Sequence, residues 1–157
     1  MKTADLVDAH GEKVDFCSLP FLKLGKKKAF HGPIANVKCF EDNALLKAEL
    51  QKLGQGRLMV VDGGASSRVA LLDYQIAMIL RDNDWAGISI NGSVRNSAEI
   101  GEFDVGMFCL SVTPKKSAKD AVGRAGVPVS FGGVTFTPGA YACAAADGVL
   151  TSRHDLR

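Results

Sequence analysis

Hydrophobic residues in the middle of the chain alternate between short apolar runs and a helical pattern. Residues 57–62, RLMVVD, and residues 87–91, GISIN, are short apolar runs typical of buried strands. Between them the apolar residues recur at helical spacing: Val69, Leu72, Ile76, Ile79 and Leu80. This pattern predicts a helix that ends near Asn83 and is capped by Ser66 or Ser67. A strand, a helix and a strand in this order predict a right-handed crossover between two parallel strands.

The segments on either side of this unit are shorter. Residues 3–10 fit a helix capped by Thr3, residues 30–40 an extended segment, and residues 44–50 a helix capped by Asn43. The last third of the chain consists of short β-rich runs separated by Gly or Pro. One of them, FGGVTF, contains a glycine pair that indicates a bulge or a close backbone approach. The sequence therefore predicts a single α/β domain over residues 1–157, in which a parallel core is extended by a second sheet.

Composition narrows the classes of function. The formal net charge of +2 is too small to indicate a nucleic-acid or membrane partner, and no apolar run is long enough to span a bilayer. The N-terminus lacks the apolar core of a secretion signal, so we expect a cytoplasmic protein. The cysteines form no CxxC pair and are expected to be free thiols, while the histidines lack metal-ligand spacing.

The first loop with candidate chemistry contains Gly63 and Gly64. It follows a predicted strand and precedes the predicted helix, a position where backbone N–H groups can bind an anion. The loop lacks a complete GxGxxG or GK[ST] nucleotide motif. A plain strand-to-helix turn is therefore the stronger interpretation of this loop taken alone.

The second loop, INGSVRNSAE at residues 90–99, places Arg95 just after a strand, where open α/β sheets bind ligands. The planar guanidinium of an arginine suits a carboxylate. Asn96 followed by Glu99 also fits a helix cap in which the glutamate reaches back to the helix start. Asparagine lacks the charge that Mg²⁺ selects. Three interpretations stay open, namely an active site, a site that has lost its metal, and a helix cap.

Four motifs, taken in order, resemble the family of the regulator of ribonuclease activity A. They are VKCFEDN at residues 37–43, VVDGG followed by a serine and Arg68, the Gly-x-x-Arg of residues 92–95, and FGGVTF at residues 131–136. The resemblance implies a swivelling β/β/α domain that forms homotrimers, sometimes paired into hexamers. It also implies one of two activities. Some members cleave 4-hydroxy-4-methyl-2-oxoglutarate into two pyruvates and decarboxylate oxaloacetate, whereas others inhibit ribonuclease E by protein–protein contact. A methyltransferase name also used in this family finds no support, because the chain has no nucleotide fingerprint.

The resemblance also assigns site residues. In the aldolases an arginine contacts the pyruvyl substrate and the following aspartate binds the divalent metal; here Arg95 matches, Asn96 does not, and Glu99 matches the acid that follows. Backbone amides of a Leu-Gly-Glu/Asp loop hold the substrate carboxylate in that branch. The corresponding stretch here has Asp73 in place of the glycine, and its charge opposes a carboxylate. The candidate metal ligands are Asn96 and Glu99, and the candidate substrate-binding residues are Gly63, Gly64, Asp73, Tyr74, Gln75, Ile76 and Arg95.

Both departures point away from aldolase chemistry and lead to three expectations. The first is a non-catalytic trimer that inhibits ribonuclease E or another RNA-decay protein and needs no cofactor. The alternative is an aldolase or oxaloacetate decarboxylase that depends on Mg²⁺ or Mn²⁺ and acts through Arg95. The third is a protein that binds a small carboxylate in the remnant pocket. In a trimer a neighbouring subunit can also supply a carboxylate that this chain lacks.

Overall fold

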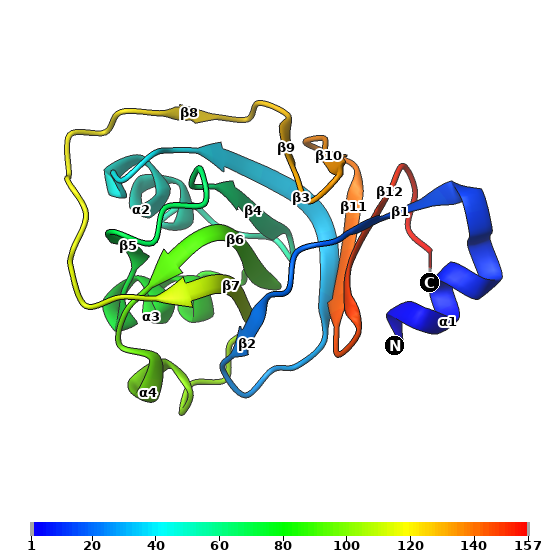
Figure 1. The fold of residues 1–157 in the computed structure, drawn as a ribbon, viewed down its shortest axis with the longest axis horizontal. Coiled ribbons are helices and arrows are strands. Elements are labelled where there is room, and N and C mark those ends of the chain that lie inside the picture. The colour runs from blue at the N-terminus through cyan, green and yellow to red at the C-terminus, as the bar shows by residue number, and fades with distance from the viewer. Residues whose placement is uncertain (1, 157) are drawn as a thin grey trace.

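A mixed β-sheet forms the centre of the molecule, as the computed structural model of the chain shows for the described residues 2–156 (Figure 1). The strands are β1 (Val14–Cys17), β2 (Leu22–Leu24), β3 (Phe30–Lys38), β4 (Leu58–Asp62), β5 (Ala70–Leu72), β6 (Gly87–Val94), β7 (Met107–Val112), β8 (Arg124–Ala125), β9 (Val129–Phe131), β10 (Val134–Phe136), β11 (Tyr141–Ala145) and β12 (Gly148–Ser152). The helices are α1 (Thr3–His10), the 3-10 helix η1 (Gly11–Lys13), α2 (Ala44–Leu50), α3 (Tyr74–Asp82) and α4 (Ser97–Ile100). Within residues 2–156 no helix has the length and apolar character needed to cross a membrane.

The sheet joins a parallel centre to antiparallel edges. Its main strand order is β1-β12-β11-β3-β4-β6-β7-β2. The four central strands β3, β4, β6 and β7 are parallel, which confirms the parallel pair predicted from the two apolar runs. β2 closes one edge, and the antiparallel strands β11, β12 and β1 extend the other. The predicted second sheet is thus mostly a continuation of the first, beside a small separate hairpin of β9 and β10.

Hydrophobic side chains fill both faces of the central strands. On β4, Met59 and Val61 pack with the cluster that contains the apolar residues of α2 and α3. Leu58 and Val60 belong to the second cluster, which contains the β9–β10 hairpin. A central parallel strand is covered on both faces in this way, and for that reason its sequence is a continuous apolar run without alternation.

The helix between the two central strands begins later than its apolar spacing predicts. Residues 70–72 form β5, which pairs with β6, and α3 begins only at Tyr74. Asp73 caps this helix, because its Oδ1 accepts the Ile76 N–H at 2.9 Å; the predicted caps Ser66 and Ser67 are wrong. All three residues of β5 are buried, so their apolar character reflects a short buried strand, although their spacing also fits the first turn of a helix.

Other local predictions also differ from the structure. Thr3 does not cap α1, because Lys2 occupies the cap position and makes no side-chain hydrogen bond there. Asn43 occupies the cap position of α2 without capping it, and Asp42 accepts the Ala44 N–H at 3.1 Å instead. The glycine pair of FGGVTF is the tight turn of the β9–β10 hairpin, with φ of 60° and 83°, and not a bulge. The alternative prediction of a close approach is confirmed at Gly132, where a Cβ would clash with the Cys17 Sγ.

The four cysteines are buried thiols that form no disulfide within residues 2–156, as the sequence predicts. Burial raises the pKa of the Cys109 thiol to about 12. Burial, together with the nearby charges of Asp42 and Asp62, raises the pKa of the Cys39 thiol to about 12 as well. Because the thiolate is the nucleophilic form, these two cysteines are inert packing residues.

Candidate functional site

The predicted site residues fall into two groups at the carboxyl ends of the parallel strands. β6 leads into Arg95 and Asn96, which lie against the start of α3, since the Arg95 N–H donates to the Leu72 carbonyl at 2.9 Å. β4 leads into the Gly63-Gly64 loop, which bonds instead to Asn91 of β6. The structure therefore joins the arginine to the Asp73 stretch and gives the glycine loop different partners.

The glycine loop uses its own N–H groups internally. The Gly63 and Ala65 N–H groups both donate to the Asn91 carbonyl, at 3.0 and 3.1 Å, and the Gly64 N–H donates to Asp62 Oδ1 at 3.0 Å. Gly64 has a φ of 65°, and a Cβ there would lie 2.6 Å from the Phe40 ring. This arrangement favours the strand-to-turn interpretation, because the three donors that an anion would need already have partners.

Arg95 is half-buried and pairs within the chain. Its Nη2 lies 3.8 Å from Asp73 Oδ2, and its Nη1 donates to the Pro114 carbonyl at 3.5 Å. The side chain of Arg95 is 33 % exposed and that of Asp73 20 % exposed. The guanidinium thus faces a carboxylate, the kind of group that the sequence predicts for its ligand, and this carboxylate belongs to the protein itself.

The Asp73 carboxylate makes two contacts at once. Its Oδ1 accepts the Ile76 N–H at the first turn of α3, and its Oδ2 lies beside Arg95. A backbone amide and an arginine are the two kinds of donor that the family resemblance assigns to a substrate carboxylate. Tyr74 and Gln75, the two residues that follow Asp73, are exposed, and Ile76 is buried. Asp73 therefore occupies one backbone donor expected to hold a ligand and places its negative charge near the arginine.

Asn96 caps a helix, although not the helix predicted. It adopts a left-handed conformation, with φ 59° and ψ 39°, and makes no side-chain cap to α4. Its Oδ1 instead accepts the Tyr74 N–H of α3 at 3.2 Å. Glu99 is exposed and does not make the predicted reciprocal bond within the described chain. The capping box is therefore wrong, and the amide of Asn96 joins the end of β6 to the start of α3.

Replacing Asn96 with alanine is expected to lower the free energy of unfolding by about 1–2 kcal/mol, because the variant loses the hydrogen bond to Tyr74 and because alanine adopts a left-handed conformation less readily than asparagine. Urea denaturation measures this change. Asn96→Gly is the matched control, since it keeps the backbone conformation and loses only the side-chain bond. Equal stability of Asn96→Gly and wild type would show that the bond to Tyr74 contributes nothing.

The residues present do not fit a divalent metal. The amide oxygen of Asn96 already accepts a hydrogen bond, and Glu99 is an exposed single carboxylate. No group of three or more His, Cys, Asp or Glu side chains within residues 2–156 is arranged to hold a metal ion. Magnesium and manganese are bound through several oxygen ligands, among them carboxylates, so this donor set is too weak in charge and number.

A second charged cluster beside the glycine loop was missed from the sequence. The Glu41 carboxylate accepts from Ser66 Oγ at 2.6 Å and from Arg68 Nε at 2.7 Å, and the Arg68 guanidinium lies 5.8 Å from the centre of the Phe40 ring. Hydrogen bonds from Ser66 and then Arg68 hold the pKa of Glu41 below its usual range. The cluster connects the loop after β3 to the loop after β4. In the sequence, the one indication of it is the presence of an acid, Glu41 in VKCFEDN, and a base, Arg68 after the glycine pair.

Asp42 anchors a long segment over the same edge of the sheet. Residues 113–123, called the strap below, run from the end of β7 to the start of β8 (Figure 1). The buried Asp42 carboxylate accepts the N–H groups of Asp120, Ala121 and Val122 at 2.9, 3.2 and 3.3 Å. Burial acts to raise the pKa of Asp42, but these bonds and the one from Ala44 outweigh it, so the pKa lies below its usual range. Nothing in the sequence pattern predicts this long-range tie.

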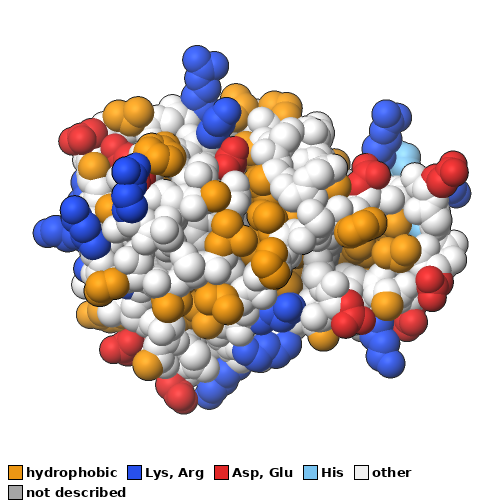
Figure 2. Space-filling model, in the orientation of Figure 1, with side chains coloured by type: hydrophobic (Ala, Val, Ile, Leu, Met, Phe, Trp, Pro, Cys, Tyr) orange, Lys and Arg blue, Asp and Glu red, His pale blue; other side chains and the backbone are white. Residues whose placement is uncertain are grey.

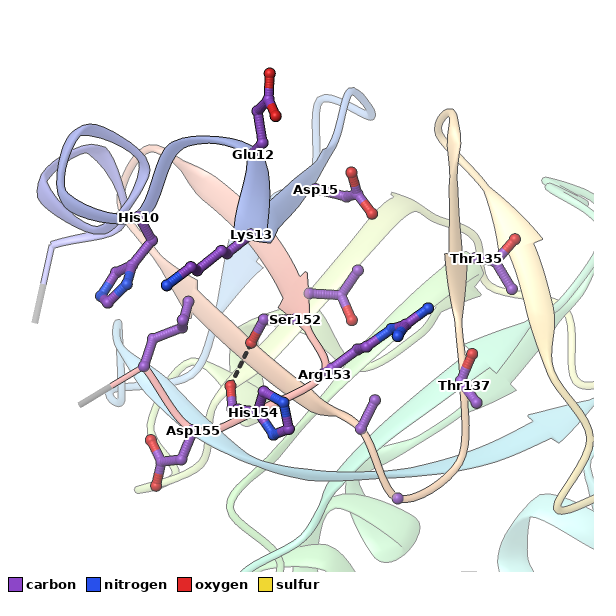
Figure 3. A pocket seen from close by; sticks show the side chains of 14 residues that line it. His10, Glu12, Lys13, Asp15, Thr135, Thr137, Ser152, Arg153, His154 and Asp155 are labelled. Atoms are coloured by element: carbon purple, nitrogen blue, oxygen red, sulfur yellow. Dashed lines mark hydrogen bonds between the residues drawn. The ribbon is translucent and has the colours of Figure 1, made fainter.

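A large hollow lies at the other end of the molecule. It measures about 1130 Å³, and Figure 3 shows His10, Lys13, Arg153 and His154 around it. Acidic and basic side chains line it together, and none of the predicted site residues is among them. Volume alone is thus a poor guide to the chemistry here, and the paired Arg95 and Asp73 remain the better candidate site.

The chain is similar to proteins with different names. The family model RraA-like (Aldolase/RraA) matches residues 3–151. A protein of Aromatoleum aromaticum (strain DSM 19018 / LMG 30748 / EbN1), provisionally named a 4-hydroxy-4-methyl-2-oxoglutarate aldolase, is 44% identical, over 99% of this chain and 98% of that protein.

Two solved structures are also similar. One is named S-adenosylmethionine: 2-dimethylmenaquinone methyltransferase, from Geobacillus kaustophilus HTA426, with 45% identity and a TM-score of 0.97 over 99% of this chain and 97% of that chain. The other is named the RNA-processing inhibitor RraA of Thermus thermophilus, with 36% identity and a TM-score of 0.94 over 98% and 93%. The α/β fold expected for a swivelling β/β/α domain is confirmed by these matches.

Proposed function

The chain belongs to the RraA-like family, and we propose that it is a binding member of this family that inhibits ribonuclease E or a related RNA-decay enzyme without turnover. In this proposal the protein acts as a homotrimer or hexamer, requires no cofactor, and meets its target through protein–protein contact. A small carboxylate is at most a weak ligand of the pocket beside Arg95. The similarity to a structure named as an RNA-processing inhibitor supports the choice of target class.

The observation that carries the proposal is the double engagement of Asp73. Its carboxylate accepts the Ile76 N–H and lies 3.8 Å from the Arg95 guanidinium. A substrate carboxylate would have to displace Asp73 from the Ile76 N–H and, at Arg95, would lie beside its negative charge. The protein's own group is at a high effective concentration, so it competes strongly with a free ligand.

The chemistry at Asn96 supports the same conclusion. Cleavage to pyruvate and decarboxylation of oxaloacetate both pass through an enolate whose negative charge needs stabilisation. The donor set around Asn96 and Glu99 does not fit the divalent metal that supplies it in the aldolases. Arg95 alone would carry this task, and the loss of one such stabiliser costs on the order of 10²–10³ in rate.

The second candidate is a lyase that releases pyruvate and depends on Mg²⁺ or Mn²⁺. Two observations favour it: the name of the relative from Aromatoleum aromaticum, and the position of Arg95 at the end of β6. For this chain to work as such a lyase, Asp73 would have to move away from Arg95, and further metal ligands would have to come from outside residues 2–156.

One preparation of the protein tests both candidates. We expect the wild type to inhibit the ribonuclease E of its own source on a fluorescent RNA substrate, and to release no pyruvate from 4-hydroxy-4-methyl-2-oxoglutarate or oxaloacetate with Mg²⁺ or Mn²⁺. Asn96→Asp and Arg95→Ala are the comparison variants. Pyruvate release by the wild type that disappears in Arg95→Ala would establish the lyase and overturn the proposal. Absence of both inhibition and binding would contradict the regulator.

A further inference from the structure

A second hollow, of about 300 Å³, lies between α1 and the outer end of the sheet. Val7, Phe16 and Leu150 give it an apolar wall, and the carboxylates of Asp8 and Asp147 line it as well. Phe16 is 65% exposed, a large fraction for an aromatic side chain on a strand. None of the residues around Arg95 lines this hollow, so it is separate from the candidate site.

The hydroxyl of Thr3 marks the hollow as a binding site. Thr3 lines it and is 3% exposed, and its Oγ1 has no hydrogen-bond partner within the described chain. A buried hydroxyl without a partner costs free energy, and such groups usually have a partner in the functional state. A polar group that enters the hollow can supply this partner.

The charge around the hollow is acidic. Residues 2–17 contain four acids and two bases, and Asp8 and Asp147 form no ion pair within residues 2–156. Figure 2 shows acidic and basic side chains beside hydrophobic ones at the right-hand end, where Figure 1 places α1 and β1, and the charged residues that line the hollow itself are both acidic. An apolar wall with unpaired carboxylates suits the side chain of an arginine or a lysine, whose stem packs on apolar groups and whose cation meets the acids.

The outer side of β1 pairs with no further strand within residues 2–156, and the β9–β10 hairpin lies beside it. β1 is the terminal strand, with β12 on its inner side. On the outer side the Ser18 N–H donates to the Gly132 carbonyl at 2.9 Å. Backbone groups two residues apart point the same way along a strand, so the N–H and C=O of Phe16 also face outward. These groups are free, within the described chain, to pair with an added strand.

We propose that the hollow and the outer edge of β1 dock a basic, extended segment of a partner protein. An arginine or lysine of that segment packs on Phe16 and meets Asp8 and Asp147, and its backbone pairs with Phe16 by strand addition. This inference rests on the proposed protein-binding role and names the surface that performs it. Enzymes that handle RNA hold its phosphates with Lys- and Arg-rich segments, so an acidic docking surface fits this class of partner.

The test measures binding of a fluorescent, capped hexapeptide, acetyl-Thr-Arg-Val-Arg-Val-Thr-amide, to the full chain by fluorescence anisotropy. A peptide with glutamate in place of both arginines is the charge control. We expect the arginine peptide to bind and the glutamate peptide not to bind. The double variant Asp8→Asn, Asp147→Asn should weaken binding about tenfold, as should Phe16→Ala, because each removes one part of the recognition. Glu102→Gln, an exposed acid beyond α4, should bind like the wild type.

Three results would overturn the proposal. The first is equal binding of the two peptides, and the second is an unchanged affinity of the double variant. The third is a wild type that does not bind the peptide, together with a lower oligomeric mass of Phe16→Ala. The last result would make this face an interface between copies of the chain. The two proposals can also fail separately. If the double variant still inhibits the ribonuclease, this surface is not the docking site, but the proposed regulator function stands. If the protein binds the peptide and does not inhibit the ribonuclease, the docking surface stands, but the ribonuclease is not its partner.

Discussion

Asp42→Ala is expected to lower the free energy of unfolding by about 2–4 kcal/mol, because three N–H groups of the strap and one of α2 lose a charged acceptor. Asp42 is 3% exposed, so water cannot fully replace the lost bonds. Asp42→Asn should lie between alanine and wild type, since an amide supplies one acceptor without the charge. Urea denaturation gives the values. Asp120→Asn is the matched control, because only the backbone of Asp120 is bonded to Asp42, and it should change stability by less than about 0.5 kcal/mol.

The same carboxyl makes stability depend on pH. Its pKa is lower in the folded protein than the ordinary value of 3.8, so its contribution is fully present above about pH 4 and is lost as the pH falls through the folded value. The wild type should therefore lose part of its advantage over Asp42→Asn below pH 4. A constant difference between the two proteins from pH 7 to pH 3 would show that the charge of Asp42 does not stabilise the strap.

Asp73→Gly is expected to tighten the binding of oxalate or pyruvate about 10- to 100-fold, because Arg95 and the Ile76 N–H become available to the ligand. The variant should also be less stable by about 1 kcal/mol, since α3 loses its cap. Isothermal titration calorimetry measures the affinity. The gain should disappear in the double variant Asp73→Gly, Arg95→Ala.

Asp84→Gly serves as the charge control for this experiment. Asp84 is an exposed acid at a φ of 62°, so glycine removes the same charge without strain and should leave the affinity unchanged. Wild-type protein that binds oxalate as tightly as Asp73→Gly would show that Asp73 leaves the donors free, and it would remove the main support for a pocket filled by the protein itself.

The parts of the fold that follow local patterns could be predicted from the sequence. The apolar runs of β4 and β6 identified the parallel centre because strands buried on both faces have no polar alternation. The start of α3 could not be predicted, because the apolar residues of β5 happen to continue the helical spacing of α3. Two interactions decide where the helix begins: the pairing of β5 with β6 and the cap at Asp73. The spacing of apolar residues carries information on neither of them.

The candidate site shows the same division. Arg95 and the departures at Asn96 and Asp73 could be identified from the residues and the family resemblance. Their roles as partners could not, because the bond from Tyr74 to Asn96 joins residues 22 positions apart, and the bond from Asp120 to Asp42 joins residues 78 positions apart. Such contacts arise when the sheet has assembled, and no spacing along the chain reports them.

The strap has a consequence for the entropy of the chain. Its ties to Asp42 join residues 78 positions apart, and closing so long a loop has an entropic cost that the buried hydrogen bonds must offset. Arg95 bonds to Pro114 and the Ala70 N–H bonds to Lys115, both at the beginning of the strap. The Asp42 carboxylate at one end of the strap and the backbone bonds at its other end therefore hold together the segment that lies against the arginine.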